Sequence, residues 1–398
     1  AVSGNGYFCN TTSAAFTVTL PSSPSAGDIV GIKDYANTAD TNNITIGRNG
    51  SNIQGTASDF VISTEGRSVL LVYVDATKGW LVTSASQASD IAIPPAFITA
   101  TGGTVTTSGD FKIHTFTGPG TFCVSQIGNG PTNPAGGPTT ISYMVIAGGA
   151  SGGRPNGSGG TGGGGAGGFR EGRDITPSYT ASPLVAPAGL TITASPFPVS
   201  VGGGGAAVTP SEPDCTSGGN PGSSSIFSTI TSAGGGGGGA SSSVPGGLSG
   251  GSGGGARYGP GTGGSGNTPP VSPPQGNNGG NTPGTTRSAS GGGGAGAVGS
   301  NGYPGSGYPT GANPGGPGGA GVTTEITASP VAYAGGGGGG RYAGSQGSGG
   351  TGGGGASGNP GVNGTANTGG GGGGGSFPAS GNSGVGGSGI VVIRYKFQ

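Results

Sequence analysis

The sequence predicts an all-β protein in two unlike parts, with a glycine-rich region of the polyglycine-II type and essentially no α-helix. Short apolar runs with the periodicity of β-strands recur along the chain. Glycine supplies 106 of the 398 residues, and nine of these fall in the first hundred, which leaves 97 for the remainder. Only 29% of the residues are hydrophobic and 7% are charged, so a single large apolar core is excluded.

Residues 1–95 are expected to form a small β module. Strand-like stretches alternate there with Pro, Gly, Asn and Asp at regular spacing, as in domains built from short strands and tight turns. Phe16, Val18 and Leu20 alternate with polar residues, so we expect these three side chains to share one face of a strand.

The core of this module is expected to be a hairpin. The continuous apolar run 69–74 is typical of a strand that is buried on both faces, and the run 80–82 follows after a short turn. Pro94 and Pro95 then interrupt the pattern, because proline fixes its own φ and restricts the preceding residue. We place the domain boundary at these prolines.

Residues 96–147 are expected to be a second strand-forming segment that leads into the glycine-rich domain, 148–398. The strand sequences of this segment are 111–116, 121–124 and 141–146. The run 390–395 has the same apolar character as 141–146. We therefore expect these two flanking strands to pair and to hold together the ends of the glycine-rich region.

Strand-like sequence leads into glycine three times. Residues 228–233 precede six consecutive glycines, residues 325–334 precede six more, and residues 191–201 precede four. A sequence rich in Gly, Ser and Pro is compatible with a flexible linker. In the ordered alternative, which we predict here, backbone hydrogen bonds between neighbouring segments hold the glycines in place.

The geometry expected for these glycine segments is polyglycine-II. Glycine costs roughly 1 kcal/mol per residue in an α-helix relative to alanine, which leaves extended conformations. A polyproline-II helix has about 3 residues per turn, rises about 3.1 Å per residue and makes no internal hydrogen bonds, so neighbouring segments must supply the partners. The glycine run 369–375 would span roughly 22 Å in this form.

The charge distribution argues against nucleic acid and acidic membrane surfaces as partners. Thirteen basic and thirteen acidic residues give a formal net charge of +0, and no lysine occurs between Lys112 and Lys396. Binding to phosphate needs clustered Lys and Arg. No apolar stretch approaches the length of a membrane span. We predict neither nucleic-acid binding nor membrane insertion.

No catalytic, cofactor or metal site is predicted. The only histidine, His114, is expected to be a packed or surface residue of a strand, because no cluster of Cys, His or carboxylate accompanies it. Residues 250–254 match the nucleophile pattern G-x-S-x-G but lack the strand-to-helix turn that this motif needs. Cys9, Cys123 and Cys215 are too few and too scattered for a disulfide framework.

Exposed aromatic residues in glycine surroundings are the candidates for binding a receptor. Aromatic rings on rigid loops can stack on sugars or insert into protein pockets. The candidate residues are Tyr258, Tyr303, Tyr308, Arg341, Tyr342 and Phe377. The alternative is that these residues cap the ends of glycine helices or pack between neighbouring subunits.

The chain resembles the glycine-rich domain of phage tail-fibre and virion structural proteins. The resemblance rests on FTGPGTF at 116–122, YMVIAGG at 143–149, the repeated polyglycine runs and the closing sequence GGSGIVVIRY at 386–395. The first hundred residues are similar to a β module of fibre proteins from aquatic phages. The resemblance implies virion attachment and recognition of a host surface, as in glycine-rich phage adhesins built from packed polyglycine-II helices.

We therefore expect a non-catalytic phage fibre or adhesin subunit that needs no cofactor and is located in the virion or outside the cell. The expected partners are copies of the chain itself, other virion proteins and a host-surface glycan or protein; a trimer is implied by resemblance to fibres. The alternative is an extracellular structural filament without a receptor. Aromatic loops at one end would favour attachment, whereas complementary surfaces at both ends would favour a filament.

Overall fold

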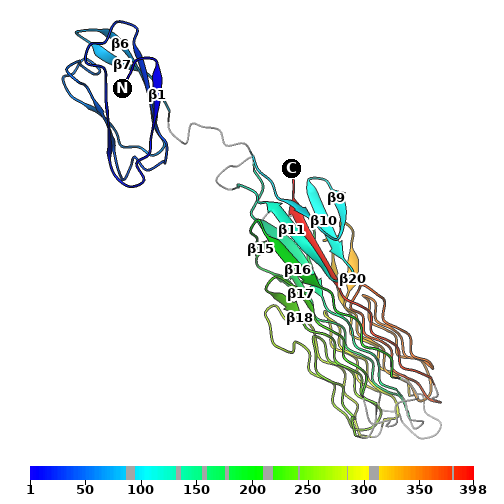
Figure 1. The fold of residues 1–398 in the computed structure, drawn as a ribbon. Coiled ribbons are helices and arrows are strands. Elements are labelled where there is room, and N and C mark those ends of the chain that lie inside the picture. Colours follow the sequence, from blue (N-terminus) through cyan, green and yellow to red (C-terminus); the bar gives the residue numbers. More distant parts are fainter. Residues whose placement is uncertain are drawn as a thin grey trace. The chain divides into compact units, whose positions relative to one another are not determined.

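The fold consists of β-strands joined by extended segments and turns. The computed structural model describes residues 1–86, 95–130, 136–154, 159–174, 179–208, 218–240, 243–284, 286–303, 313–378 and 381–398. No helix occurs among these residues, so the predicted all-β fold class is confirmed. The chain divides into two compact units, Ala1–Pro94 and Pro95–Gln398 (Figure 1).

The first unit contains two sheets that share one core. The four-stranded sheet has the order β1 (Asn5–Cys9), β3 (Ile29–Asp34), β6 (Ser68–Asp75) and β7 (Gly79–Ser86). The three-stranded sheet has the order β2 (Phe16–Thr19), β4 (Ile44–Gly47) and β5 (Phe60–Ile62). Leu71 and Trp80 from the first sheet pack with Ile44 and Ile46 from the second, and all four are buried.

The predicted hairpin is present, since β6 pairs with β7 in antiparallel register. The expectation that its first strand is buried on both faces is wrong. Val69 and Leu71 are buried, but Leu70 and Val74 are 38% and 36% exposed. The core shared with the three-stranded sheet covers only one face of this strand, so alternate side chains turn away from it.

The expected common face of Phe16, Val18 and Leu20 holds only in part. Val18 and Leu20 are buried in the core of the first unit, whereas Phe16, the first residue of β2, is 47% exposed. The core therefore covers the later part of this strand but not its beginning.

The second unit contains three sheets in addition to the glycine segments. The seven-stranded sheet has the order β14 (Val185–Ala186), β13 (Phe169–Gly172), β12 (Thr140–Ile146), β21 (Ile390–Lys396), β10 (Phe111–Phe116) and β9 (Thr104–Ser108), with β15 (Leu190–Thr191) paired to β12. The five-stranded sheet has the order β18 (Ile230–Ser232), β17 (Ser225–Phe227), β16 (Pro196–Ser200), β11 (Gly120–Gln126) and β8 (Thr99–Thr101). The two-stranded sheet consists of β19 (Val322–Thr324) and β20 (Val331–Tyr333).

The expected pairing of the strands that flank the glycine region is confirmed. β12 pairs with β21 in antiparallel register, with Tyr143 opposite Ile393 and Val145 opposite Val391. β10 pairs with the other edge of β21. The strand at 390–396 therefore lies between two strands that precede the glycine segments in the sequence.

Both faces of the seven-stranded sheet are covered. Tyr143 and Val145 of β12 belong to a core shared with the five-stranded sheet, which includes the buried Phe122. Met144 and Ile146 of the same strand belong to a second core on the opposite face. This alternation explains why the run 143–146 is apolar at every position.

The glycine segments continue from these strands and run side by side (Figure 1). The predicted repeat corresponds to hairpins, because β18 and β20 are each the second strand of a hairpin that leads into six glycines. Within the strand-like stretch 325–334, the strand itself is short, since β20 occupies only Val331–Tyr333.

Backbone hydrogen bonds join each glycine segment to several others. The N–H groups of residues 162, 165 and 168 donate to one segment, 233–239; those of 163 and 166 donate to a second, 290–293; and those of 164 and 167 donate to a third, 369–372. These bonds measure 2.8–3.1 Å. The partner segment thus changes at each residue and returns after three.

The carbonyl groups of the same segment also accept hydrogen bonds from a different neighbouring segment at successive residues. They accept hydrogen bonds from three further segments, 147–153, 252–255 and 337–340. Among the described residues, segment 162–168 therefore has six hydrogen-bonded neighbours. Backbone groups that would otherwise be buried without partners are satisfied in this way.

Close approach of these backbones requires glycine. A Cβ atom added to Gly163 would overlap the carbonyl oxygen of Gly337, and one added to Gly164 would overlap that of Ala150. No side chain can be accommodated at either position without moving a neighbouring backbone. The glycine runs are therefore explained by contact on all sides rather than by flexibility.

Candidate functional site

The candidate site lies at the end of the glycine segments that is remote from the strands, which we call the distal end. Segment 147–154 leaves β12, and segment 159–168 returns to β13. Arg154 and Gly159 therefore mark the distal end of these two segments. The other glycine segments also run to this end of the second unit (Figure 1).

Gly160 brings residues from three distant parts of the sequence together. Its N–H donates to the carbonyl of Arg287 at 3.2 Å, and its carbonyl accepts from the N–H of Tyr258 at 3.1 Å. A Cβ atom on Gly160 would overlap the carbonyl oxygen of Gly340, which precedes Arg341. The backbones of these residues are consequently fixed next to one another at the distal end.

The side chains at the distal end form stacked pairs. The rings of Tyr342 and Phe377 stack with centroids 4.6 Å apart and planes inclined by 20°. The guanidinium group of Arg287 lies over the Tyr342 ring at 5.1 Å, and that of Arg257 lies over the Tyr258 ring at 4.3 Å. Cation–π contacts of this kind hold both partners in a defined orientation.

The structure brings together four of the six residues predicted as receptor candidates. Tyr258, Arg341, Tyr342 and Phe377 lie at the distal end, where the N–H of Phe377 donates to the carbonyl of Arg341 at 3.0 Å. Tyr303 is 48% exposed, and its carbonyl accepts from the hydroxyl of Ser288 at 3.2 Å. Tyr308 lies outside the described residues.

Two arginines of the distal end were missed in the sequence. Arg154 and Arg287 are single charged residues near the ends of glycine-rich segments, and this position is the signal that could have identified them. The Nε atoms of Arg154, Arg257 and Arg341 are buried and have no hydrogen-bond partner among the described residues.

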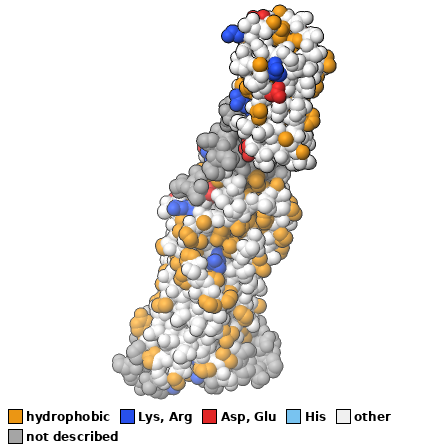
Figure 2. Space-filling view, turned by 90° about the vertical axis from the view of Figure 1, so that its left-hand side faces the viewer, with side chains coloured by type: hydrophobic (Ala, Val, Ile, Leu, Met, Phe, Trp, Pro, Cys, Tyr) orange, Lys and Arg blue, Asp and Glu red, His pale blue; other side chains and the backbone are white. Residues whose placement is uncertain are grey.

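The described carboxylates of the second unit are separated from its distal end, whereas basic side chains occur both there and at the strands. At the distal end every charged side chain that the structure describes is an arginine. The described carboxylates lie within or directly beside the strands, at Asp110, Glu171, Asp174 and Glu325. Glu212 and Asp214 lie outside the described residues. On the face drawn in Figure 2, the glycine-rich region between the strands and the distal end shows few charged atoms.

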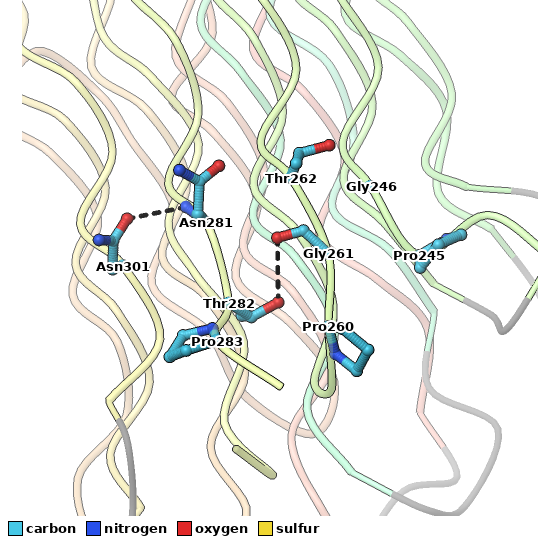
Figure 3. Close-up of a pocket in the computed structure, with 9 residues that line it drawn as sticks. All are labelled: Pro245, Gly246, Pro260, Gly261, Thr262, Asn281, Thr282, Pro283 and Asn301. Atoms are coloured by element: carbon cyan, nitrogen blue, oxygen red, sulfur yellow. Dashed lines mark hydrogen bonds between the residues drawn. The ribbon is translucent and has the colours of Figure 1, made fainter. Parts of the chain in front are cut away.

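A groove of about 600 Å³ lies beside the backbone of Arg257, which is hydrogen-bonded to the lining residues Pro245 and Thr282. It is lined by residues 245–246, 260–262, 281–283 and Asn301, which belong to four neighbouring segments (Figure 3). Proline rings lie at one end of the groove, and the two asparagine side chains lie toward the other (Figure 3). The groove thus combines apolar rings with amide groups.

Hydrogen bonds fix the walls of the groove. The N–H of Asn281 donates to Oδ1 of Asn301 at 2.8 Å, and Oδ1 of Asn281 accepts from the N–H of Gly263 at 2.8 Å. The hydroxyl of Thr282 donates to the carbonyl of Arg257 at 2.7 Å. The groove is therefore connected directly to the backbone that carries the Arg257 side chain.

The two residues considered for catalysis, His114 and Ser252, are both buried and lack the surroundings of catalytic groups. His114 lies in β10 and is buried, with Nδ1 2.7 Å from the carbonyl of Gly102 and Nε2 3.1 Å from the hydroxyl of Tyr395. Ser252 of the G-x-S-x-G match is buried within the glycine segments rather than exposed at a strand-to-helix turn. Neither side chain presents the geometry of an activated nucleophile and its base.

Metal and membrane features were sought in the described part of the chain. No group of three or more His, Cys, Asp or Glu side chains in these ranges is placed to hold a metal ion. These ranges likewise contain no helix of the length and apolarity that crossing a bilayer requires.

The comparison with known proteins identifies the glycine-rich region. Residues 125–396 match the model of a family described as a glycine-rich domain, which spans more than half of the 398 residues. No curated protein matches the chain in sequence. The chain belongs to the glycine-rich domain family, and the packed segments and the distal end described above are parts of that domain.

Proposed function

We propose that the glycine segments are polyglycine-II helices that pack into a stiff scaffold. The three-residue rotation of hydrogen-bond partners along 162–168 supports this geometry, because a polyproline-II helix has about 3 residues per turn. The six neighbours of this segment fit a lattice in which each helix is surrounded on every side. Residues 147–153 would then extend the scaffold by roughly 22 Å beyond β12.

The function that this scaffold supports best is that of a non-catalytic attachment subunit, a phage fibre or adhesin located in the virion or outside the cell. One observation carries the proposal. Tyr258, the neighbours Arg341 and Tyr342, and Phe377 come from three distant parts of the sequence and gather at one end of the glycine segments. β9, β10 and β11 and the strand at Ile390–Lys396 lie at the other end of the same unit (Figure 1).

This arrangement places the proposed binding surface at one end of the second unit. The opposite end, which we call the mounting end, is then the part that joins other proteins. Rings that are held by stacking and by a fixed backbone lose little conformational freedom when they bind, which favours recognition of a host-surface glycan or protein. The proposed partners at the mounting end are copies of the chain and other virion proteins.

The proposal is tested by locating the chain in native material. Gold-labelled antibodies against the purified chain should decorate fibres on virions when viewed by electron microscopy. The purified full chain, added in excess, should also reduce adsorption of those virions to host cells. Label along continuous filaments that carry no capsid would overturn the proposal in favour of a structural polymer.

A further inference from the structure

We infer that the groove beside Arg257 binds an acidic polysaccharide, whose carboxylate or sulfate groups face the arginines of the distal end. The inference rests on the proposed attachment function and specifies the chemical class of its ligand. The groove, the arginine pairs and the separation of charge along the second unit are the three observations that carry it.

Arg257 is arranged to receive an anion. Its guanidinium group lies 4.3 Å over the ring of Tyr258, a contact that orients the group without using its N–H donors. Its backbone is held separately, because its N–H donates to the carbonyl of Pro245 at 3.0 Å and its carbonyl accepts from Thr282. The side chain can therefore take part in binding without being needed to hold the scaffold.

The groove offers the contacts that a sugar chain uses. The rings of Pro245, Pro260 and Pro283 supply apolar surface for the C–H faces of sugar rings. Asn281 and Asn301 are exposed, and among the described residues neither Nδ2 atom has a hydrogen-bond partner, so each can donate to a hydroxyl. The open groove crosses four segments, which suits a polymer better than a single enclosed sugar.

Charge complementarity selects an acidic polymer. Arg154, Arg287 and Arg341 lie at the same distal end as Arg257, while the described carboxylates of this unit lie at the strands. Among the described residues the charges of this end have one sign, which raises the local concentration of ligands of the opposite sign. Neutral sugars would use the proline and asparagine contacts but not these arginines.

The test measures binding of the purified full chain to four immobilised polymers by biolayer interferometry. Polygalacturonate carries carboxylates and heparin carries sulfates, dextran is a neutral polysaccharide, and polyglutamate is a polyanion without sugar rings. We expect binding to one or both acidic polysaccharides, weaker binding to dextran and polyglutamate, and loss of affinity as salt concentration rises. The preference between the first two polymers identifies the acidic group.

Two variants test which residues contact the polysaccharide, and a third serves as the control. Arg257→Gln should reduce affinity for the preferred acidic polysaccharide by at least about tenfold, since a charge-assisted hydrogen bond is lost. Asn281→Ala should reduce it by about threefold through loss of one neutral hydrogen bond. Arg48→Gln in the first unit removes the same charge from a different place and should leave affinity unchanged. The melting temperature of each variant confirms that it is folded.

Three results would overturn the inference. These are equal binding to dextran, equal binding to polyglutamate, and an equal effect of Arg48→Gln and Arg257→Gln. Attachment of the same chain to host cells is measured in parallel. If the chain attaches to cells but binds no acidic polysaccharide, the ligand class is wrong and the proposed function stands. If antibody label follows capsid-free filaments, the proposed function is wrong whichever polymer binds.

Discussion

Tyr342 and Phe377 stack face to face at the distal end, although they lie in different glycine-rich stretches of the sequence. Each ring is half-buried and therefore remains partly open to solvent. The stack fixes an apolar surface at the end of an otherwise polar backbone scaffold.

Replacing one ring of this stack should reduce attachment far more than stability. An aromatic pair contributes about 1 kcal/mol beyond the area it buries, so Tyr342→Ala should lower the melting temperature by only about 2 °C. Binding of the labelled full chain to host cells, measured by flow cytometry, should fall severalfold. Tyr35→Ala, which removes an exposed ring of the first unit, is the matched control. A large fall in melting temperature with unchanged binding would show that the rings only cap the scaffold.

A single methyl group inside the glycine scaffold should be costly. In Gly163→Ala the new Cβ meets the carbonyl of Gly337, so we expect a loss of about 1–3 kcal/mol in the free energy of unfolding. Gly203→Ala is the control, because a Cβ there would have nothing within 4 Å. Thermal unfolding of both variants checks the prediction. Equal melting temperatures would contradict the close contact.

The stability of the second unit should fall in mild acid because of His114. Burial lowers the pKa of this imidazole, the nearby Lys112 lowers it further, and the hydrogen bond to Gly102 opposes them. The neutral ring donates from Nδ1 to the Gly102 carbonyl and accepts at Nε2 from the hydroxyl of Tyr395. Protonation leaves the first bond in place but turns Nε2 into a donor, so that it can no longer accept from Tyr395.

The sign of this effect follows from the direction of the pKa shift. The folded state holds His114 neutral more strongly than the unfolded state, so its contribution is complete above about pH 6.5 and declines as the pH falls toward the lowered pKa. The melting temperature of the wild type should therefore drop more between pH 7.5 and pH 5 than that of His114→Gln. Parallel curves for the two proteins would rule out this histidine as the cause.

The buried carboxylate of Glu171 should be required as an acceptor. It accepts from the N–H of Ser182 at 2.9 Å and from the hydroxyl of Thr324 at 2.6 Å. In Glu171→Gln an amide N–H₂ replaces one acceptor, which should cost about 1–3 kcal/mol of unfolding free energy. Glu325→Gln, at a more exposed carboxylate, should cost less than half as much. Chemical denaturation measures both, and an equal loss would contradict the role assigned to burial.

Apolar periodicity predicted several strands, among them those at 141–146 and 390–395, but not the neighbours of the glycine segments. The runs 141–146 and 390–395 carry large side chains on both faces, and their pairing was predicted correctly. Segment 162–168 has almost no side chains, so nothing in its sequence distinguishes the six segments that surround it. The outer face of β6 was misjudged for a related reason, since an apolar run does not reveal whether a second layer covers it.

The distal end was predicted in composition but not in arrangement. Aromatic residues among glycines were recognisable, and Tyr258, Tyr342 and Phe377 do meet there. Arg154 and Arg287 were missed because each is an isolated charge, and only the folded backbone places Arg287 over the Tyr342 ring and Arg154 at the same end. The groove at Asn281 could not be predicted, because it forms between segments whose order in space is not encoded by any local pattern.

The position of β21 between β10 and β12 has a consequence for synthesis of the protein. β10 and β12 are synthesised early but cannot both pair with β21 until residues 390–396 have left the ribosome. The seven-stranded sheet is complete only then. Contacts between segments so distant in sequence also make folding slow. A nascent chain stalled within the glycine region would expose two unpaired strand edges, so a nonsense mutation there should yield aggregated or degraded protein rather than a shortened scaffold.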